Sequence, residues 1–137
     1  YQPSRGLGDV YKRQDTMLEL FTDDMEWVFP NGEKFEGKEE ARQGFNYVFS
    51  LWDEMKMDSG GDDEPPIILA TSGEQGQFLM RWSPYSYKSF SGEEYTIRNH
   101  TVLWFNDDGM IKGAYNYYDR KDISKAYETD PIDEIED

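Results

Sequence analysis

The side chains of this sequence that could do chemistry are few, because it contains one histidine and no cysteine. These counts exclude a thiol nucleophile, a disulfide scaffold and any site built on two imidazoles. His100 could act as a general base beside Asn99, since imidazole titrates near physiological pH. Alternatively, it is a histidine of the outer sheet face beside Arg98, the interpretation that the strand pattern described below favours. A register shift of one residue would exchange the two interpretations.

Carboxylates are abundant, but their spacing does not form a recognisable site. Residues 58–64, Asp-Ser-Gly-Gly-Asp-Asp-Glu, lack the alternating ligands and the distal bidentate Glu of a calcium loop. Asp23 and Asp24 are interpreted as solvating the end of a helix, with a catalytic acid as the alternative. No Gly-x-Ser-x-Gly motif occurs, so a serine triad is not supported. We therefore expect no metal and no cofactor, and the catalytic residues stay unknown.

The charge balance narrows the possible partners. The 137 residues include 14 Lys or Arg and 29 Asp or Glu, which gives a net charge of −15. Such a chain repels nucleic-acid phosphates and anionic lipids, so we expect neither nucleic acid nor membrane as a partner. The apolar run at residues 67–70 is far shorter than the roughly 20 residues that cross a bilayer. The sequence therefore predicts a soluble acidic protein, for which the cytoplasm is the favoured compartment.

The two ends of the sequence differ from its middle. Residues 1–14 form a basic stretch without periodicity. They resemble the translated read-through of a sequencing linker from metagenomic DNA, with a genuine flexible arm as the alternative. We therefore expect a non-native segment at 1–14 and a domain at 15–127 whose first helix is truncated, and a signal peptide could have been lost with it. Six of the ten residues at 128–137 are acidic, which predicts a disordered tail.

Hydrophobic periodicity predicts the elements between these ends. Residues 15–22 are expected to end a helix, and Asn31-Gly32 is expected to turn a short hairpin between residues 25–30 and 33–36. Apolar residues recur every three or four positions from Ala41 to Met55, which predicts a helix of about five turns. Residues 67–72, 77–88, 94–106 and 110–119 are expected to be strands separated by glycine-containing turns. Together they predict an α+β domain in which one curved antiparallel sheet wraps the helix.

Three short motifs support a family resemblance. They are Phe21–Trp27, Phe35–Ala41 and Asp108–Ile111, the last before a strand that ends at Asp119. In order and spacing they resemble the nuclear transport factor 2-like superfamily, and within it the SnoaL-like group, over residues 15 to about 122. The resemblance implies a cone-shaped fold with a central pocket between sheet and helices. Members include isomerases, cyclases, dehydratases, epoxide hydrolases and non-catalytic modules, so the fold leaves the function open.

Strand alternation predicts which side chains face that pocket. On residues 94–105 the uncharged set, which includes Asn99 and Thr101, is expected to face inward, because a buried unpaired charge is costly. The same argument turns Phe78, Met80 and Trp82 inward and Arg81 outward. The register of the family adds residues of the first and last strands. The expected ligand-binding set is therefore Trp27, Phe29, Phe78, Met80, Trp82, Asn99, Thr101, Asn116 and Tyr118.

The resemblance also argues against two activities. Ketosteroid isomerases carry carboxylates where Phe29 and Thr101 stand, and neither of these side chains can transfer the proton. Epoxide hydrolases of the superfamily need an Asp–Arg–Asp array in the pocket, and the expected inward set has neither residue type. We expect a domain that binds a small hydrophobic or aromatic molecule, with cofactor-independent acid–base chemistry of the isomerase, cyclase or dehydratase type left open.

The alternative is a non-catalytic module that forms a homodimer or binds a protein. Its predicted interface is an apolar stripe on the convex sheet face, formed by Val102, Trp104, Tyr115 and Tyr117. A pocket below a few hundred Å³ would favour this module. A carboxylate or His100 pointing into a larger pocket would favour the ligand-binding domain with catalysis.

Overall fold

The computed structural model describes residues 15–57 and 67–121. The stretch 1–14, the calcium-like motif at 58–64 and the acidic tail at 128–137 lie outside the described residues. Within the described residues, no helix is both long enough and apolar enough to span a membrane.

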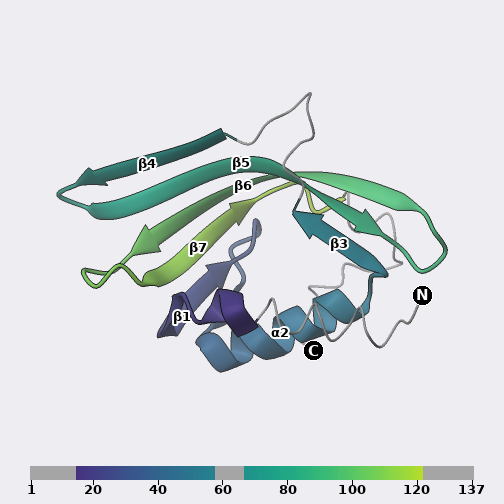
Figure 1. Cartoon of the computed structure of the whole chain (residues 1–137), viewed down its shortest axis with the longest axis horizontal. Coiled ribbons are helices and arrows are strands. Elements are labelled where there is room, and N and C mark those ends of the chain that lie inside the picture. Colours follow the sequence, from purple (N-terminus) through teal and green to yellow (C-terminus); the bar gives the residue numbers. More distant parts are fainter. Residues whose placement is uncertain (1–14, 58–66, 122–137) are drawn as a thin grey trace.

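The fold is one curved sheet packed against one helix (Figure 1). The order of the strands is β2-β1-β7-β6-β5-β3, and β4 also pairs with β5. The elements are β1 Phe21–Val28, β2 Lys34–Glu36, α2 Lys38–Ser50, β3 Glu54–Met57, β4 Ile67–Gly73, β5 Gly76–Lys88, β6 Glu94–Phe105 and β7 Ile111–Tyr117. The predicted α+β fold with a curved sheet is confirmed. The sheet is mixed, because β1 runs parallel to β7 while the other neighbours are antiparallel.

The helix end that the sequence predicts at residues 15–22 is shorter, because the first strand takes the last two of these residues. Only residues 15–18 form a helical turn, and Asp23 and Asp24 lie within β1. Both carboxylates are exposed, and Asp23 Oδ1 lies 3.6 Å from Lys38 Nζ. Pairing between β1 and β7 is irregular from Phe21 to Glu26, so an acidic pair fits here without entering the core. The two residues therefore do not solvate a helix end.

The hairpin predicted at Asn31-Gly32 is present. Trp27 pairs with Phe35 across it, and Gly32 has φ = +90°, a conformation that glycine adopts at little cost. The next strand pairings also follow the turns predicted at residues 73–76, 91–92 and 106–109. The turn motifs therefore predict correctly which consecutive strands pair as hairpins.

The predicted five-turn helix is too long. Helix α2 ends at Ser50, and Met55 lies in β3, opposite Tyr87 of β5. Trp52, between the two elements, packs its ring against Tyr87 and Tyr95, with ring centroids 4.9 and 5.8 Å apart. The apolar spacing continues past the helix end because helix and strand both turn apolar side chains toward the same interior. Periodicity alone could not separate them.

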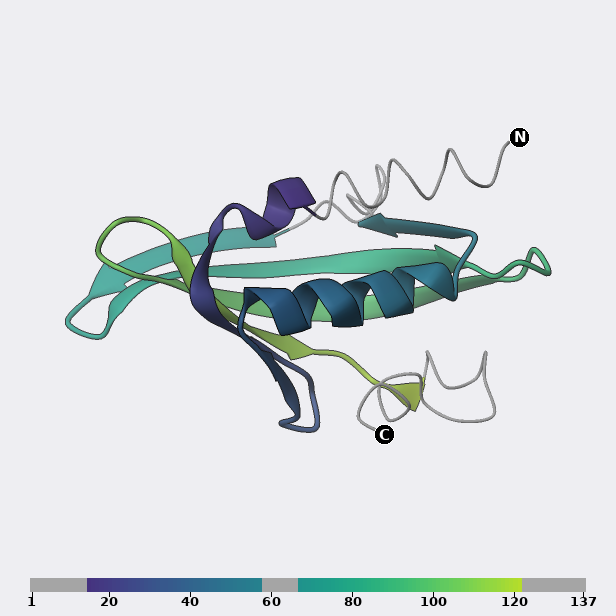
Figure 2. The ribbon, with the colours of Figure 1, turned by 90° about the horizontal axis from the view of Figure 1, so that it is seen from below.

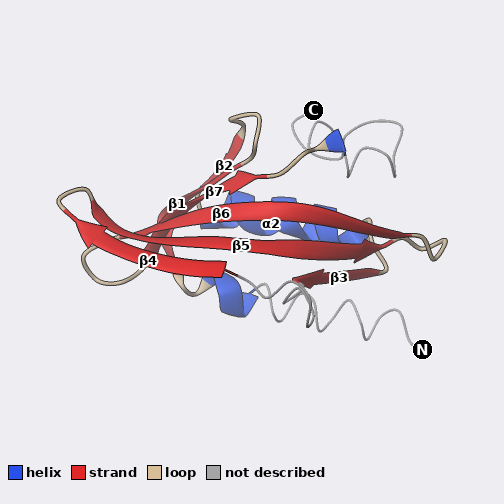
Figure 3. Cartoon of the chain, turned by 90° about the horizontal axis from the view of Figure 1, so that it is seen from above, coloured by secondary structure: helices blue, strands red, loops and turns tan. Residues whose placement is uncertain are grey.

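The core lies between α2 and the concave face of the sheet, which we call the inner face (Figure 2). The rings of Phe29, Phe35 and Phe45 meet edge to face, with centroids 4.9 and 5.6 Å apart. Gly44 of α2 makes room for this cluster, because a Cβ at that position would overlap the Phe35 ring. The opposite face of β4, β5 and β6, which we call the outer face, has no covering element among the described residues (Figure 3).

Candidate ligand cavity

A cavity of about 220 Å³ lies between α2 and the inner face of the sheet. Aromatic and apolar side chains make up most of its wall, and the polar side chains come from the strands. The lining residues are Met17, Trp27, Phe29, Phe45, Val48, Phe49, Met55, Lys56, Tyr85, Tyr87, Asn99, Asn116 and Tyr118. Five members of the predicted ligand-binding set therefore meet here, namely Trp27, Phe29, Asn99, Asn116 and Tyr118.

The alternation predicted for β6 is confirmed. Ile97, Asn99 and Thr101 are buried, whereas Arg98 is exposed. His100 is half-buried and shares the outer face with Arg98. The interpretation of His100 as a histidine of the outer face therefore holds, and its ring does not line the inner cavity.

Three buried polar side chains form a chain of hydrogen bonds behind the cavity. Asn99 Nδ2 donates to Thr101 Oγ1 at 2.7 Å, and the Thr101 hydroxyl donates to Asn116 Oδ1 at 3.0 Å. Asn116 Nδ2 donates to the backbone carbonyl oxygen of Val28 at 3.1 Å. Thr101, the sixth predicted residue on this face, is thus the link between the two asparagines. The chain ties β6 and β7 to the end of β1.

Two tyrosines of β5 complete the wall and were missed from the sequence. Tyr85 and Tyr87 lie opposite Ile97 and Tyr95 and share their inner face. Burial raises the pKa of Tyr85, although the charge of Arg81 and the polar side chains of the neighbouring Thr101 and Asn99 oppose the shift. Burial also raises the pKa of Tyr87 far above its ordinary value, with a smaller contribution from the neighbouring tyrosines. Both phenols are therefore protonated at neutral pH.

The predicted orientation of β5 is wrong by one residue. Phe78, Met80 and Trp82 pair with Trp104, Val102 and His100, which places them on the outer face. Arg81 pairs with Thr101 and lies on the inner face, half-buried. A guanidinium on a long stem is tolerated there, because Arg81 is only half-buried and its stem can pack while the charged group reaches toward solvent.

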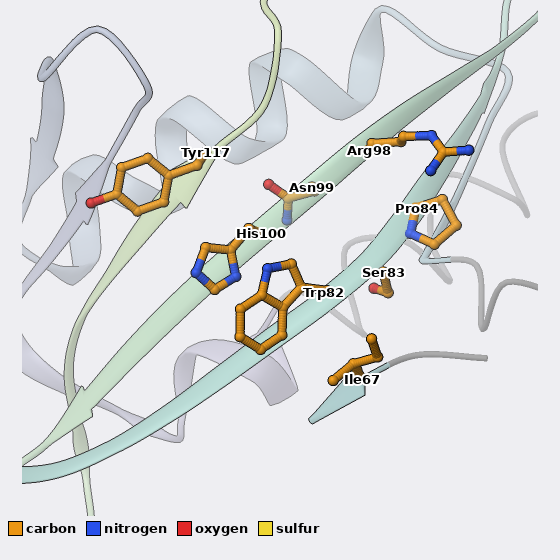
Figure 4. Close-up of a pocket in the computed structure, with 8 residues that line it drawn as sticks. All are labelled: Ile67, Trp82, Ser83, Pro84, Arg98, Asn99, His100 and Tyr117. Atoms are coloured by element: carbon orange, nitrogen blue, oxygen red, sulfur yellow. The ribbon is translucent and has the colours of Figure 1, made fainter. Parts of the chain in front are cut away.

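Trp82, which the sequence placed on the wrong face, joins His100 and Tyr117 in a ring stack on the outer face (Figure 4). Trp82 stacks on His100 with centroids 4.2 Å apart, and His100 faces Tyr117 at 5.8 Å. His100 Nδ1 lies 3.1 Å from the carbonyl oxygen of Arg81, so Nδ1 carries the proton that it donates. An open hollow of about 520 Å³ adjoins the stack, and Asn99 lines both this hollow and the inner cavity.

The wall of the inner cavity suits a neutral molecule. Among the described residues that line it, none is a carboxylate or an imidazole, and the ionisable groups are Lys56 and three tyrosines. Residues 15–57 and 67–121 contain no group of three metal-ligating side chains. The arrangement can enclose an apolar body and offer it hydroxyl and amide groups.

Comparison with solved structures shows the same fold at low sequence identity. An NTF2-like protein of unknown function from Burkholderia pseudomallei K96243 is 17% identical, with a TM-score of 0.67 over 90% of this chain and 93% of that chain. TerC, co-crystallised with polyporic acid, is 16% identical, with a TM-score of 0.64 over 90% and 93%. SalBIII, an epoxide hydrolase/cyclase-like enzyme of pyran ring formation in salinomycin, is 14% identical, with a TM-score of 0.60 over 87% and 88%. No curated protein matches the sequence.

A family model gives the assignment that these structures alone do not. The model described as SnoaL-like domain matches residues 8–114, most of the sequence. It agrees with the resemblance carried by the three motifs and with the NTF2-like architecture of the solved neighbours. The chain therefore belongs to the SnoaL-like domain family.

Proposed function

We propose that the chain binds a small neutral molecule with an aromatic or hydrophobic body in its inner cavity. The observation that carries this proposal is the cavity itself, about 220 Å³ in volume and lined by aromatic rings around a buried amide and hydroxyl network. An apolar wall with a few fixed polar groups is the usual composition of a small-molecule site. Family membership, and the co-crystallisation of TerC with polyporic acid, support the binding of a small molecule.

The size of the cavity limits the ligand. Pockets for drug-sized molecules span about 300–1,000 Å³, and this one is smaller. It therefore fits a one-ring compound. A volume of about 220 Å³ meets the size criterion given above for a non-catalytic module. Together with the position of His100 on the outer face, it favours binding over turnover. The buried O–H groups of Tyr85 and Tyr87 could serve as proton donors, as acid–base chemistry of the cyclase or isomerase type requires, but the described wall supplies no carboxylate as the base.

Titration with 4-ethylphenol, followed by ¹H–¹⁵N NMR, tests the binding proposal. Val48→Phe places a ring in the cavity from α2, whereas Ser50→Phe adds the same ring at an exposed position of that helix. We expect at least a tenfold loss of affinity in Val48→Phe and no loss in Ser50→Phe, with folding of both checked by circular dichroism. Absence of binding by the unchanged protein, or equal affinity of all three proteins, would contradict the proposal.

A second proposal concerns the outer face, which we infer to be a homodimer interface. Trp104 and Tyr115 stack there at 4.5 Å, and Tyr115 and Tyr117 remain 39% and 51% exposed. The apolar surface continues onto β4, where Ile67 and Leu69 are more than half exposed. A continuous patch of this kind is unusual on a monomer, and a two-fold axis would bring its rings onto each other.

Light scattering distinguishes the two states. A dimer gives twice the mass of the chain, and Tyr117→Glu should lower it to the mass of one chain by placing a charge in the interface. Glu36→Gln, an exposed substitution on β2 at the far end of the sheet, should leave the mass unchanged. A monomer at micromolar concentration would exclude the interface.

A further inference from the structure

We propose that the cavity selects ligands that carry a hydrogen-bond donor, a hydroxyl or an N–H group, which binds to Asn99 Oδ1. This inference deepens the proposed function and rests on it. The supporting feature is the direction of the buried hydrogen-bond chain, which is fixed at one end and leaves an unused acceptor at the other. Because each link in the chain constrains the next, the argument proceeds from Val28 toward the cavity.

The backbone of β1 fixes the first link. The carbonyl oxygen of Val28 can only accept, so the group of Asn116 that faces it at 3.1 Å must be the NH₂ group. This orientation turns Asn116 Oδ1 toward Thr101, 3.0 Å from its hydroxyl oxygen. The Thr101 hydroxyl has one proton and donates it to Asn116.

The second link then orients Asn99. Because the Thr101 proton is already used, Thr101 Oγ1 can only accept from Asn99, and the Asn99 atom 2.7 Å away is its amide nitrogen. Flipping the Asn99 amide would bring two acceptors together. Asn99 Oδ1 therefore cannot join this chain and points elsewhere.

Asn99 Oδ1 is a buried acceptor that no described residue satisfies. The residue is only 6% exposed, and this oxygen has no hydrogen-bond partner within the described part of the chain. Leaving such an atom unsatisfied is costly, and native proteins rarely do so without a bound group or a functional reason. Asn99 lines the inner cavity, so a molecule in the cavity can supply the missing donor.

The surrounding wall specifies that the donor is neutral. An ammonium group would also donate, but the described wall contains no carboxylate to balance a buried positive charge. Tyr85 shares this part of the wall, and its raised pKa keeps the phenol protonated. A ligand hydroxyl can donate to Asn99 Oδ1 and accept from a phenol, which makes a hydroxyl the best match to the two groups.

Two isomeric probes test the inference on the unchanged protein. 4-Ethylphenol and 4-methylanisole have the same formula, but only the phenol can donate a hydrogen bond. We expect about tenfold tighter binding of 4-ethylphenol, since an unmet buried acceptor lowers affinity on this scale. Nuclear Overhauser contacts between the probe and the side chains of Val48 and Phe49, which line the inner cavity but not the outer hollow, should locate it in the inner cavity. Equal affinity for both isomers, or contacts only with the outer hollow, would overturn the inference.

A variant separates this inference from the proposed function. Asn99→Leu keeps a side chain of similar volume and removes the acceptor, so we expect the phenol to lose about tenfold in affinity while 4-methylanisole binds as before. If both isomers bind the unchanged protein with equal affinity, and Val48→Phe weakens the binding of both, the cavity binds ligands without selecting for a hydrogen-bond donor. If neither isomer binds, the proposed function fails and the inference fails with it. The comparison of isomers needs no folded variant, so it remains decisive if Asn99→Leu does not fold.

Discussion

The inner and outer faces of β5 and β6 are both rich in aromatic rings, but the rings pack differently on the two faces. On the inner face, rings meet edge to face under α2 and enclose a hydrogen-bonded chain of amide and hydroxyl groups. On the outer face, rings stack nearly parallel along the sheet. Two of these rings, Trp82 and Tyr117, remain partly exposed. The presence of a covering helix, more than composition, therefore decides which face becomes a core with a cavity.

The largest effect is expected from the buried hydrogen-bond chain. Thr101→Val removes the hydroxyl that joins Asn99 to Asn116 and leaves a buried donor and a buried acceptor without partners. We expect a loss of about 3 kcal/mol in the free energy of unfolding, measured by urea denaturation. Thr96→Val makes the same change at an exposed, outward-facing position of β6. It should change the free energy of unfolding by less than about 0.5 kcal/mol. Similar losses in both variants would mean that the buried chain contributes little.

A smaller loss is expected from adding one methyl group to α2. Gly44→Ala drives a Cβ into the ring of Phe35, which is only 4% exposed and held edge to face by Phe29 and Phe45. Overpacking of this kind costs about 1–3 kcal/mol, and the better helix propensity of alanine offsets up to about 1 kcal/mol of it. We therefore expect a net loss of about 2 kcal/mol, measured by urea denaturation.

The outer face offers a matched control for this substitution. A Cβ at Gly113 of β7 would overlap the Trp104 ring, but that ring lies on the half-exposed outer face and can move outward. Gly113→Ala should therefore cost less than half as much as Gly44→Ala. Equal costs would show that the rings of the two faces are held with equal rigidity.

Much of the fold could be read from the sequence, because local signals fixed it. The turns at Asn31-Gly32 and at residues 106–109 set the hairpins, and β6 has all its charges on one side of the alternation. That single strand was enough to place Asn99 and Thr101 on the inner face and His100 on the outer one.

The predictions are wrong where the local sequence pattern does not show which face of an element the rest of the fold buries. Both alternating sets of β5 contain aromatic residues, so the pattern does not separate the two faces. The cost of burying a charge predicts Arg81 outward, but its long side chain can reach solvent from the inner face. Tyr85 and Tyr87 were missed for the same reason. The end of α2 was missed because Met55 continues the helical spacing although it lies in a strand. The unused acceptor on Asn99 depends on three hydrogen bonds, two of which join different strands, and no local pattern encodes it.

The buried phenols make the inner face sensitive to alkaline pH. The pKa of Tyr87 is raised in the folded protein, whereas an unfolded tyrosine titrates near about 10. Below that pH the Tyr87 hydroxyl is protonated in both the folded and the unfolded protein, so its titration does not lower the free energy of unfolding. Above it the unfolded chain loses a proton that the folded chain keeps, so the free energy of unfolding falls by up to about 1.4 kcal/mol for each further pH unit.

Tyr87→Phe removes this titration while keeping the ring that packs on Trp52. Urea denaturation at pH 9, 10 and 11 should show the unchanged protein losing stability above pH 10 and the variant losing less of it. Some slope should remain, because burial also raises the pKa of Tyr85. Parallel curves for the two proteins would mean that the Tyr87 hydroxyl reaches water in the folded state. In that case the inner cavity would be open to solvent at this end, and its wall would resemble the outer face more closely than the packing of α2 implies.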